Sequence, residues 1–340
     1  MPAPRNPPNR FHPVEIDWEE PPLPERLEIS EDHAASILSE NDSPDIPFRW
    51  GVNPYRGCTH ACAYCYARAF HEYLGFGAGT DFERRIVIKP SAPALLESAF
   101  RAPSWTGEVV AFSGVTDCYQ TLERRYRLTR GCLEVCARYR NPVQIITRSP
   151  LITRDLDLLL ALHEHRAVAV TFSIPLGDPD LARAVEPGAP PPAARLKAMA
   201  ALAEAGVPVG VSLAPLIPGL SDAGIPAVLR AAREAGATWA FTQMVRLSGA
   251  VAVVFEERLR AAAPLRAETV LARIRRAHGG ELGDPRFGAR MRGQGESWEA
   301  SLRLFELWKA KLGYGAGHAP PEPSPFRRPG QGQQLRLFGG

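Results

Sequence analysis

The stretch Cys58-Thr-His-Ala-Cys62-Ala-Tyr64-Cys65 holds three cysteines within eight residues, directly after an expected strand and before an expected helix. Three thiolates at this spacing can bind three irons of a 4Fe–4S cubane and leave the fourth iron without a protein ligand. A cluster that chelates a substrate needs such an open iron, whereas an electron-transfer cluster needs a fourth cysteine. The stretch therefore predicts a 4Fe–4S site at Cys58, Cys62 and Cys65.

A zinc site is an alternative for the same cysteines. Structural zinc usually takes four ligands as two separated pairs, and no second pair follows nearby in the sequence. His60 or His71 could still complete a set of four. Three unconnected core cysteines are a further alternative.

Composition places the chain among ordinary globular proteins. It has 340 residues, 45% of them hydrophobic and 23% charged, with a net charge of +3. That charge is too small to indicate nucleic-acid binding by itself, although arginines gather in residues 124–154 and 273–292. No secretory signal or membrane-spanning run is evident, and clustered cysteines are typical of metal ligation in a reducing compartment. We therefore expect a cytoplasmic protein that does not enter a membrane.

Apolar strand-like segments alternate with helical patterns around and after the cysteines. The expected strands are Phe48–Asn53, Glu108–Phe112, Val143–Thr147, Ala167–Ile174, Pro208–Leu213 and Thr238–Met244. The expected helices are Ala63–Leu74, Thr129–Tyr139, Arg154–His165, Ala193–Ala205, Ala223–Ala235 and Arg266–His278. This alternation predicts an α/β fold with a parallel sheet. Periodicity alone leaves open whether the sheet is doubly wound or a partial barrel.

Four parts are expected along the chain. Residues 1–47 form an extended N-terminal segment that lies against a core, and residues 48–280 form the α/β body. Residues 281–318 form a helical extension in which Ser297–Lys311 packs back through Leu302, Phe305, Leu307 and Trp308. Residues 319–340, rich in Pro, Gly and Gln, are expected to be a flexible tail.

The spacing C-x3-C-x-aromatic-C after a first strand resembles the radical S-adenosylmethionine (SAM) superfamily. The resemblance implies a partial (β/α)6 barrel of the TIM type. It also implies that the open iron chelates SAM, which an electron from an external donor cleaves reductively. The resulting 5′-deoxyadenosyl radical abstracts hydrogen from a substrate. Tyr64 matches the aromatic residue that lies against the adenine, although core packing would explain it equally well.

A longer stretch resembles spore photoproduct lyase, the branch that reverts a thymine photodimer in DNA. The matching positions are Phe172-Ser-Ile174, Glu186-Pro-Gly188, Arg195, Ala205-Gly206, Pro208, Gly210 and Ala214-Pro215, preceded by Thr116-Asp117 and Thr147-Arg148. The chain also resembles an uncharacterised bacterial group of lyase-like radical SAM proteins. That likeness rests on Asn53-Pro-Tyr-Arg-Gly-Cys58 and Ser149-Pro-Leu-Ile-Thr-Arg-Asp155.

These resemblances imply SAM contacts at the carboxyl ends of the strands, where parallel sheets and barrels build their sites. Ser113 and Gly114 would offer backbone carbonyls to the SAM ammonium group. Arg148 would pair with the SAM carboxylate, unless it forms a surface ion pair. Ser173 would bond a ribose hydroxyl. Glu186 and Arg195 are expected to form a buried structural pair.

The chain departs from spore photoproduct lyase at the hydrogen donor. That family keeps a cysteine just after its second strand, where this chain has Gly114 and Val115. Cys118 follows a few residues later and is either the donor or a buried core thiol. Cys132 and Cys136 share a helix face, and core packing is their expected role.

The stretch Gln334-Leu335-Arg-Leu337-Phe338 stands near the C-terminal end of the given sequence. It resembles the QLxLF peptide by which bacterial repair proteins bind the DNA sliding clamp, with Leu337 and Phe338 filling an apolar pocket. The alternative is a segment that folds onto the body. Both resemblances point to DNA.

The leading hypothesis is a radical SAM enzyme that acts on a DNA lesion or nucleobase and is recruited by the clamp. A second hypothesis keeps the chemistry but changes the substrate to RNA or protein. A third is a non-catalytic, clamp-associated Fe–S or zinc protein.

Overall fold

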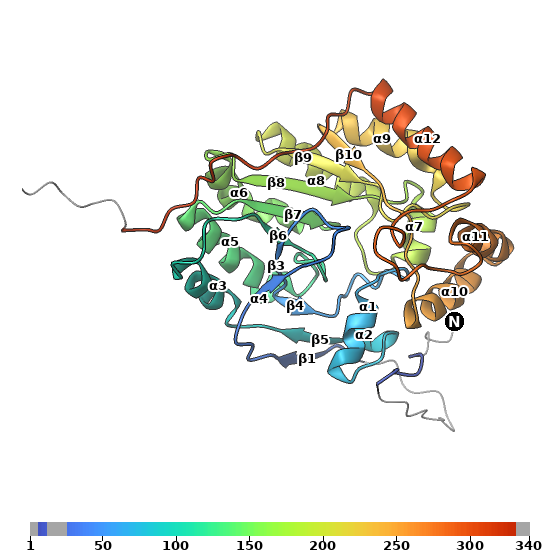
Figure 1. Cartoon of the computed structure of the whole chain (residues 1–340), viewed down its shortest axis with the longest axis horizontal. Coiled ribbons are helices and arrows are strands. Elements are labelled where there is room, and N and C mark those ends of the chain that lie inside the picture. Colours follow the sequence, from blue (N-terminus) through green and yellow to red (C-terminus); the bar gives the residue numbers. More distant parts are fainter. Residues whose placement is uncertain (1–5, 12–25, 331–340) are drawn as a thin grey trace, which may run out of the picture.

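The computed structural model describes residues 6–11 and 26–330 of the chain. Within these residues, seven strands form one sheet in the order β10-β9-β8-β7-β6-β3-β2 (Figure 1). The strands are β2 (Leu38–Glu40), β3 (Trp50–Val52), β6 (Val110–Phe112), β7 (Val143–Thr147), β8 (Val168–Ser173), β9 (Val209–Ser212) and β10 (Trp239–Phe241). β3 and the strands after it run parallel, while β2 pairs antiparallel with β3. The predicted parallel sheet is confirmed.

The strand order identifies the sheet as a partial barrel. A doubly wound sheet reverses its strand order at a switch point, whereas these parallel strands follow one another without reversal. The helices lie on the outside of the sheet in Figure 1. From α3 on, the helices between its parallel strands are α3 (Ala92–Arg101), α4 (Glu123–Tyr126), α5 (Leu128–Tyr139), α6 (Leu156–His163), α7 (Pro179–Val185), α8 (Pro192–Glu204) and α9 (Ile225–Glu234). α10 (Ala250–Ala262) and α11 (Pro264–Ala277) follow the last strand, and the 3-10 turns η2 (Pro150–Asp155) and η3 (Asp222–Gly224) precede α6 and α9.

Local sequence explains why the repeats fold this way. All six residues of β8 are buried, as expected of a strand covered on both faces. Gly206 and Gly236 follow α8 and α9 with a φ of 91° each, a left-handed conformation that glycine adopts without a Cβ penalty. Their backbone N–H groups donate to Ala203 and Arg233, so each helix ends where its glycine begins the turn into the next strand.

Residues 54–88 and part of the N-terminal segment form a second, smaller sheet that the sequence did not predict. Its order is β1 (Glu28–Glu31), β5 (Arg85–Ile88) and β4 (Tyr55–Arg56). The predicted helix Ala63–Leu74 is wrong in its first half. Tight turns continue to Ala67, followed by the short α1 (Arg68–His71), the 3-10 turn η1 (Glu72–Leu74) and α2 (Thr80–Arg84). The longer helix before β6 is α3.

α12 (Glu296–Lys311) packs back on the body, but not through the whole predicted face. Trp298 and Phe305 are buried, whereas Leu302 is 36% and Leu307 63% exposed. The helix therefore turns a narrower apolar stripe toward the barrel than its composition suggested.

The C-terminal segment, residues 314–328, lies across the amino ends of the strands. Gly315 pairs with Trp239 at the start of β10, and the Ser324 hydroxyl donates to Gly107 just before β6. The Phe326 ring packs on Phe100, and the Arg328 guanidinium donates to three carbonyl groups near the end of α3. The expectation of a flexible tail from residue 319 is therefore wrong up to Arg328, because these side chains give a proline-rich segment specific contacts.

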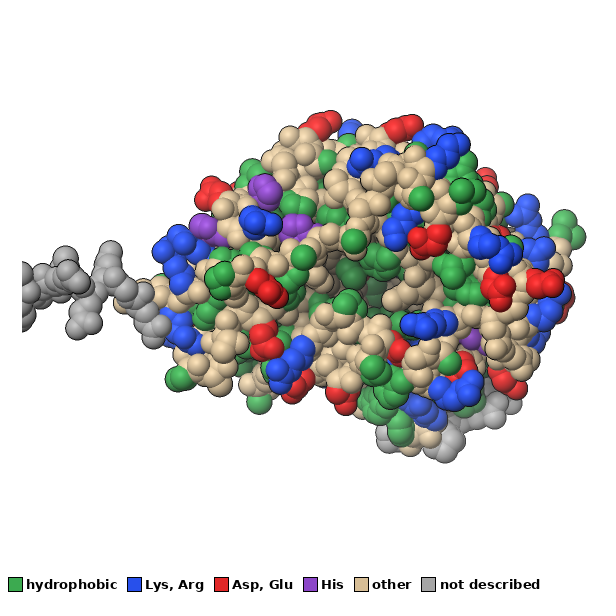
Figure 2. All heavy atoms as spheres, turned by 45° about the horizontal axis from the view of Figure 1, so that its top comes forward, with side chains coloured by type: hydrophobic (Ala, Val, Ile, Leu, Met, Phe, Trp, Pro, Cys, Tyr) green, Lys and Arg blue, Asp and Glu red, His purple; other side chains and the backbone are tan. Residues whose placement is uncertain are grey.

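Among the described residues, no helix has the length and apolar character needed to cross a membrane. Figure 2 shows a hollow in the middle of the molecule, with apolar side chains at its floor and charged side chains around it.

Candidate functional site

The cysteine loop, residues 57–65, leaves the short strand β4 and wraps in tight turns before α1. Cys58 and Cys62 are buried, and Cys65 is half-buried. Gly57 begins the loop with a φ of 78°, and a Cβ there would stand 2.8 Å from the Ile86 side chain and 2.9 Å from a backbone carbonyl. Only glycine fits this turn without displacing the small sheet.

Two buried arginines hold the backbone of the cysteine loop. The Arg68 side chain is fully buried and donates to the carbonyl groups of Cys62 at 2.9 Å and Ala61 at 3.1 Å. Arg258 of α10 donates to the same Ala61 carbonyl at 2.6 Å. Glu83 pairs with both guanidinium groups, so their charge is balanced inside the protein.

The segment after α7 closes over the loop from the other side. Gly188 donates its backbone N–H to the His60 carbonyl at 3.1 Å, and the Ala63 N–H donates to Val185 at 2.8 Å. A Cβ at Gly188 would stand 2.0 Å from the Thr59 carbonyl oxygen. The glycine therefore permits a backbone approach that any side chain would block.

The donor set fits an iron–sulfur cluster better than a zinc ion. Among the described residues, no three His, Cys, Asp or Glu side chains converge on a single metal ion, as zinc would require. The His71 ring instead packs against Phe76 and Phe82. Cubane thiolates bind separate irons and need not meet at one point.

The protein alone holds the cysteine thiols in their neutral form. Burial raises the pKa of Cys58, and nearby Asp117, Cys62 and Cys65 raise it further. Burial also raises the pKa of Cys62 to about 12. Since a metal ligates the thiolate, iron binding would release these protons.

Asp117 joins the ends of two strands to the cysteine loop. Its carboxylate accepts from the Thr147 hydroxyl and from the Arg148 backbone N–H, both at 2.7 Å. The His60 Nδ1 atom lies 3.3 Å away, close enough for an ion pair but without the geometry of a good hydrogen bond. Burial alone would raise the pKa of Asp117, but His60 and these hydrogen bonds lower it. The carboxylate therefore stays charged.

Glu186 connects three of the predicted positions. Its carboxylate pairs with Arg195 at 2.5 Å, where both side chains are 1% exposed, which confirms the expected buried pair. It also lies 3.2 Å from Nε of Arg148 and accepts from the Tyr64 hydroxyl. Burial alone would raise the pKa of Glu186, but Arg195 and Arg148 lower it to about 2.

The remaining predicted SAM contacts have partners of their own in this structure. The Ser113 hydroxyl accepts from the Cys118 backbone N–H at 2.9 Å, and the Gly114 carbonyl accepts from the Tyr66 hydroxyl. The Ser173 hydroxyl donates to the Ala214 carbonyl at 3.2 Å. The structure brings the carboxyl ends of β6, β7 and β8 to the cysteine loop, while each contact to SAM stays a prediction.

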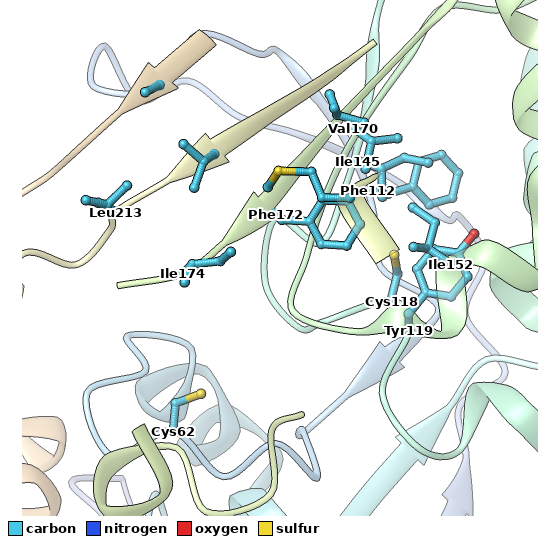
Figure 3. Packing of buried hydrophobic residues seen from close by; sticks show 14 of the residues in the cluster. Cys62, Phe112, Cys118, Tyr119, Ile145, Ile152, Val170, Phe172, Ile174 and Leu213 are labelled. Atoms are coloured by element: carbon cyan, nitrogen blue, oxygen red, sulfur yellow. The ribbon is translucent and has the colours of Figure 1, made fainter. Parts of the chain in front are cut away.

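Cys118, which the sequence left open as a hydrogen donor or a buried core thiol, lies in the core. Its side chain is 0% exposed and lies beside Tyr119 and Ile152, away from Cys62 (Figure 3). Burial raises the pKa of the Cys118 thiol well above its ordinary value. The structure thus favours a core thiol over a hydrogen donor. Cys132 and Cys136 are likewise buried in the core, as expected.

Comparison with known families decides what this site belongs to. Residues 52–232, more than half of the chain, match the radical SAM superfamily. The chain belongs to the radical SAM superfamily. The family implies a 4Fe–4S cluster and SAM as cofactors.

Similar proteins extend the likeness without naming a reaction. An uncharacterised protein of Mycobacterium tuberculosis is 44% identical over 195 residues, which cover 57% of each chain. An uncharacterised protein of Methanocaldococcus jannaschii is 29% identical over 58% of this chain and 71% of that protein. This chain thus matches little more than half the length of the mycobacterial relative.

Solved structures of spore photoproduct lyase share the fold. The complex with a dinucleoside spore photoproduct superposes with a TM-score of 0.60 and 15% identity, covering 84% of this chain and 80% of that one. A mutant with bound AdoMet and the same dinucleoside gives the same values. At this identity the likeness supports the partial barrel alone.

Sequence reasoning missed the residues that hold the loop. Arg68 stands three residues after Cys65, but nothing in its sequence context distinguishes it from a surface arginine. Arg258 lies nearly two hundred residues away from the loop it contacts. His60, a possible zinc ligand by its place in the sequence, pairs with Asp117 in the structure.

We predict that Cys58→Ala, Cys62→Ala and Cys65→Ala each prevent stable cluster assembly, because each removes one of three iron ligands. Iron and sulfide analysis after anaerobic reconstitution measures the loss. Cys132→Ala is the matched control, since this thiol is also buried but lies in α5. Equal iron loss in Cys132→Ala and Cys62→Ala would contradict the assignment.

We predict that Glu186→Gln destabilises the fold by about 3–5 kcal/mol at neutral pH, because it leaves Arg195 buried without its counter-charge. The pKa of Glu186 is lowered in the folded state, from about 4.5 to about 2. Its stabilisation is thus complete above its ordinary pKa and is lost as the pH falls toward the folded value.

Urea unfolding of both proteins across this acidic range measures the difference. The difference in the free energy of unfolding between wild type and Glu186→Gln should be constant near neutral pH and should become smaller on acidification. Glu299→Gln, at a 58% exposed carboxylate, is the control and should change little at any pH. A gap that widens on acidification would show that the sign is wrong.

Proposed function

We propose that this protein is a radical SAM enzyme that acts on a DNA lesion or nucleobase, in a reaction of the spore photoproduct lyase type. The observation that carries the proposal is the meeting of the cysteine loop, Arg148 and Glu186 at the carboxyl ends of β6 to β8. It occurs in a fold shared with a lyase solved in complex with a dinucleoside photoproduct. Parallel barrels build their catalytic sites at this end.

Cys58, Cys62 and Cys65 hold the cluster in this proposal. When bound, the cluster would pass an electron from an external donor to SAM. This electron would cleave SAM into methionine and a 5′-deoxyadenosyl radical. The loop arginines Arg68 and Arg258 keep the cysteine backbone in place.

The other site residues bind and orient SAM. Arg148 turns its guanidinium from Glu186 toward the SAM carboxylate, and the pair of Glu186 with Arg195 remains when it does so. Ser113 and Gly114 offer their carbonyl groups to the SAM ammonium group. Ser173 contacts a ribose hydroxyl, and Tyr64 lies against the adenine.

The proposal does not include Cys118 as the hydrogen donor, because its thiol is buried in the core. The reaction therefore resembles photoproduct repair in its hydrogen abstraction and differs in how the product radical is quenched.

We predict that ultraviolet-damaged DNA stimulates 5′-deoxyadenosine release by the reconstituted, dithionite-reduced enzyme. Undamaged DNA, RNA and peptide of equal concentration are the comparisons. An enzyme accelerates a reaction by binding its transition state, and only a substrate that fits the site provides this binding. Stimulation of SAM cleavage should therefore be selective for damaged DNA. Selective stimulation by RNA or peptide would replace DNA as the substrate. No 5′-deoxyadenosine under any condition would favour a non-catalytic Fe–S protein.

A clamp-binding tail completes the proposal. Gln334, Leu335, Leu337 and Phe338 lie outside the described residues, but the C-terminal segment before them is held at the amino ends of the strands. The last described residues therefore lie on the side away from the site. A tether of this kind binds a partner without covering the barrel mouth.

We predict that a bacterial sliding clamp retains the full chain in a pull-down and that Leu337→Ala/Phe338→Ala abolishes retention. The two apolar side chains carry most of the affinity of such a peptide. Substitution of Arg336, which the motif leaves unspecified, is the matched control. Unchanged retention of the double variant would remove the tail from the proposal and leave the site unaffected.

A further inference from the structure

Exposed aromatic side chains gather beside the cysteine loop. Among the described residues, five aromatic side chains are strongly exposed: Phe11 47%, Tyr66 41%, Phe70 44%, Tyr73 62% and Phe287 60%. Three of them follow Cys65 in α1, η1 and the turn before them, and Phe11 packs on Tyr73 with ring centroids 4.9 Å apart. Tyr66 meets Phe70 edge-on at 6.3 Å. We call Phe11, Tyr66, Phe70 and Tyr73 the aromatic row.

The aromatic row begins one residue after the last cluster cysteine. The Tyr66 hydroxyl donates to the Gly114 carbonyl at the end of β6, so the first ring of the row lies at the rim of the site. Exposed aliphatic side chains lie on other elements, such as Val253 on α10 and Leu307 on α12. Single apolar residues scattered over a surface need no explanation. The aromatic row instead places its flat rings together at one part of the surface.

Charges along the aromatic row favour an anionic partner. The Arg10 guanidinium lies over the Phe11 ring at 4.7 Å and over the Tyr73 ring at 5.3 Å, and its side chain is 54% exposed. The neighbouring carboxylate of Glu72 is 4% exposed and pairs with Arg10. Glu83 is likewise paired by two arginines. The local acidic groups are therefore neutralised within the protein.

Arg246 adds a cation without a partner at the same rim. It follows the carboxyl end of β10, is half-buried, and has no hydrogen bond or ion pair with any of the residues that the structure describes. Burial and nearby Arg290 lower the pKa of Arg246, whereas Tyr66 and Asp45 raise it, and the Asp45 carboxylate itself pairs with Arg290. A partly buried guanidinium loses hydration, so a bound anion would stabilise it.

We propose that the aromatic row stacks the unpaired bases of a nucleic acid strand, while Arg10 and Arg246 contact its phosphates. Rings interleaved with arginines are how proteins bind single strands, since every base offers a flat face. An enzyme that reacts with a base must also take that base out of the duplex, which leaves an unpaired stretch beside the site. The inference rests on the proposed nucleic-acid substrate and adds where its strand lies.

Two substitutions at Tyr73 separate base stacking from general apolar contact. Tyr73→Phe keeps the ring, whereas Tyr73→Leu keeps apolar surface but removes the flat face. Fluorescence anisotropy with a labelled single-stranded oligonucleotide measures the Kd for the full, cluster-loaded chain. We expect Tyr73→Phe to bind like wild type and Tyr73→Leu to bind about tenfold more weakly. Leu307→Ala, at a side chain of similar exposure, should bind like wild type.

The proposed phosphate contact has its own readout. Arg246→Gln should weaken binding and lower the slope of log Kd against log salt by about 1. A blunt duplex offers no unpaired base, so Tyr73→Leu should not change its binding. Thermal unfolding of each variant checks that the fold is intact.

Each outcome separates this surface from the proposed reaction. Unchanged single-strand binding by Tyr73→Leu would overturn the aromatic row, even if damaged DNA stimulates 5′-deoxyadenosine release. Equal loss for Tyr73→Phe and Tyr73→Leu would also overturn it, because the hydroxyl would then carry the affinity. A third outcome is that Tyr73→Leu binds more weakly than Tyr73→Phe while no DNA stimulates 5′-deoxyadenosine release. This outcome would support the aromatic row and contradict the proposed reaction on DNA.

Discussion

The structure around the site depends on one buried guanidinium, that of Arg68. A loop that places three cysteines around a cluster cannot be a helix or a strand, so it has no regular hydrogen-bond ladder, although the Cys58 and Cys62 carbonyl groups accept from Ala61 and Cys65. Arg68 supplies fixed donors to Ala61 and Cys62, and further donors to Ala78 and Gly79. Its own charge would be costly to bury without Glu83. A lysine could not replace it, because an ammonium group has fewer donors and no fixed planar geometry.

Glu186 plays the matching role on the side of the proposed SAM contacts. Arg195 neutralises it permanently in the interior, whereas Arg148 is 20% exposed and has its backbone fixed by Asp117. The partly exposed arginine can thus change partner while the buried pair keeps the carboxylate charged. Tyr64 contacts the same carboxylate, so the cysteine loop and the strand ends share one electrostatic unit.

The alternating strands and helices could be predicted because their signals are local, whereas the partial barrel was implied by the family resemblance. Apolar β-branched runs such as Val168–Ser173 mark buried strands, and Gly206 and Gly236 mark helix ends through their backbone conformation. The cysteine motif could also be predicted, because its three cluster ligands lie within eight residues of one another. The small sheet was missed because β4 has two residues and carries almost no periodic signal.

The orientation of single side chains could not be read in the same way. Cys118 lies in a loop at the expected end of the barrel, but its backbone donates to Ser113 and its thiol turns inward. Composition likewise led to a wrong prediction of flexibility for residues 319–328. The proline content does not reveal that Phe326 and Arg328 contact residues near the end of α3. Such contacts are decided by residues far away in the chain, which a single sequence does not pair.

The two ends of the barrel differ in what they offer to a partner. At the amino ends, the C-terminal segment covers the strand starts through backbone pairing and side-chain hydrogen bonds to carbonyl groups. At the carboxyl ends, the backbone of the cysteine loop is fixed by buried arginines and runs directly into α1. Because Arg68 belongs to α1, the aromatic row and the cysteines share one rigid support. A ligand bound by Tyr66 or Phe70 would therefore be held at a fixed position relative to the cluster site without any domain movement. Hydrogen abstraction requires such preorganisation of the substrate.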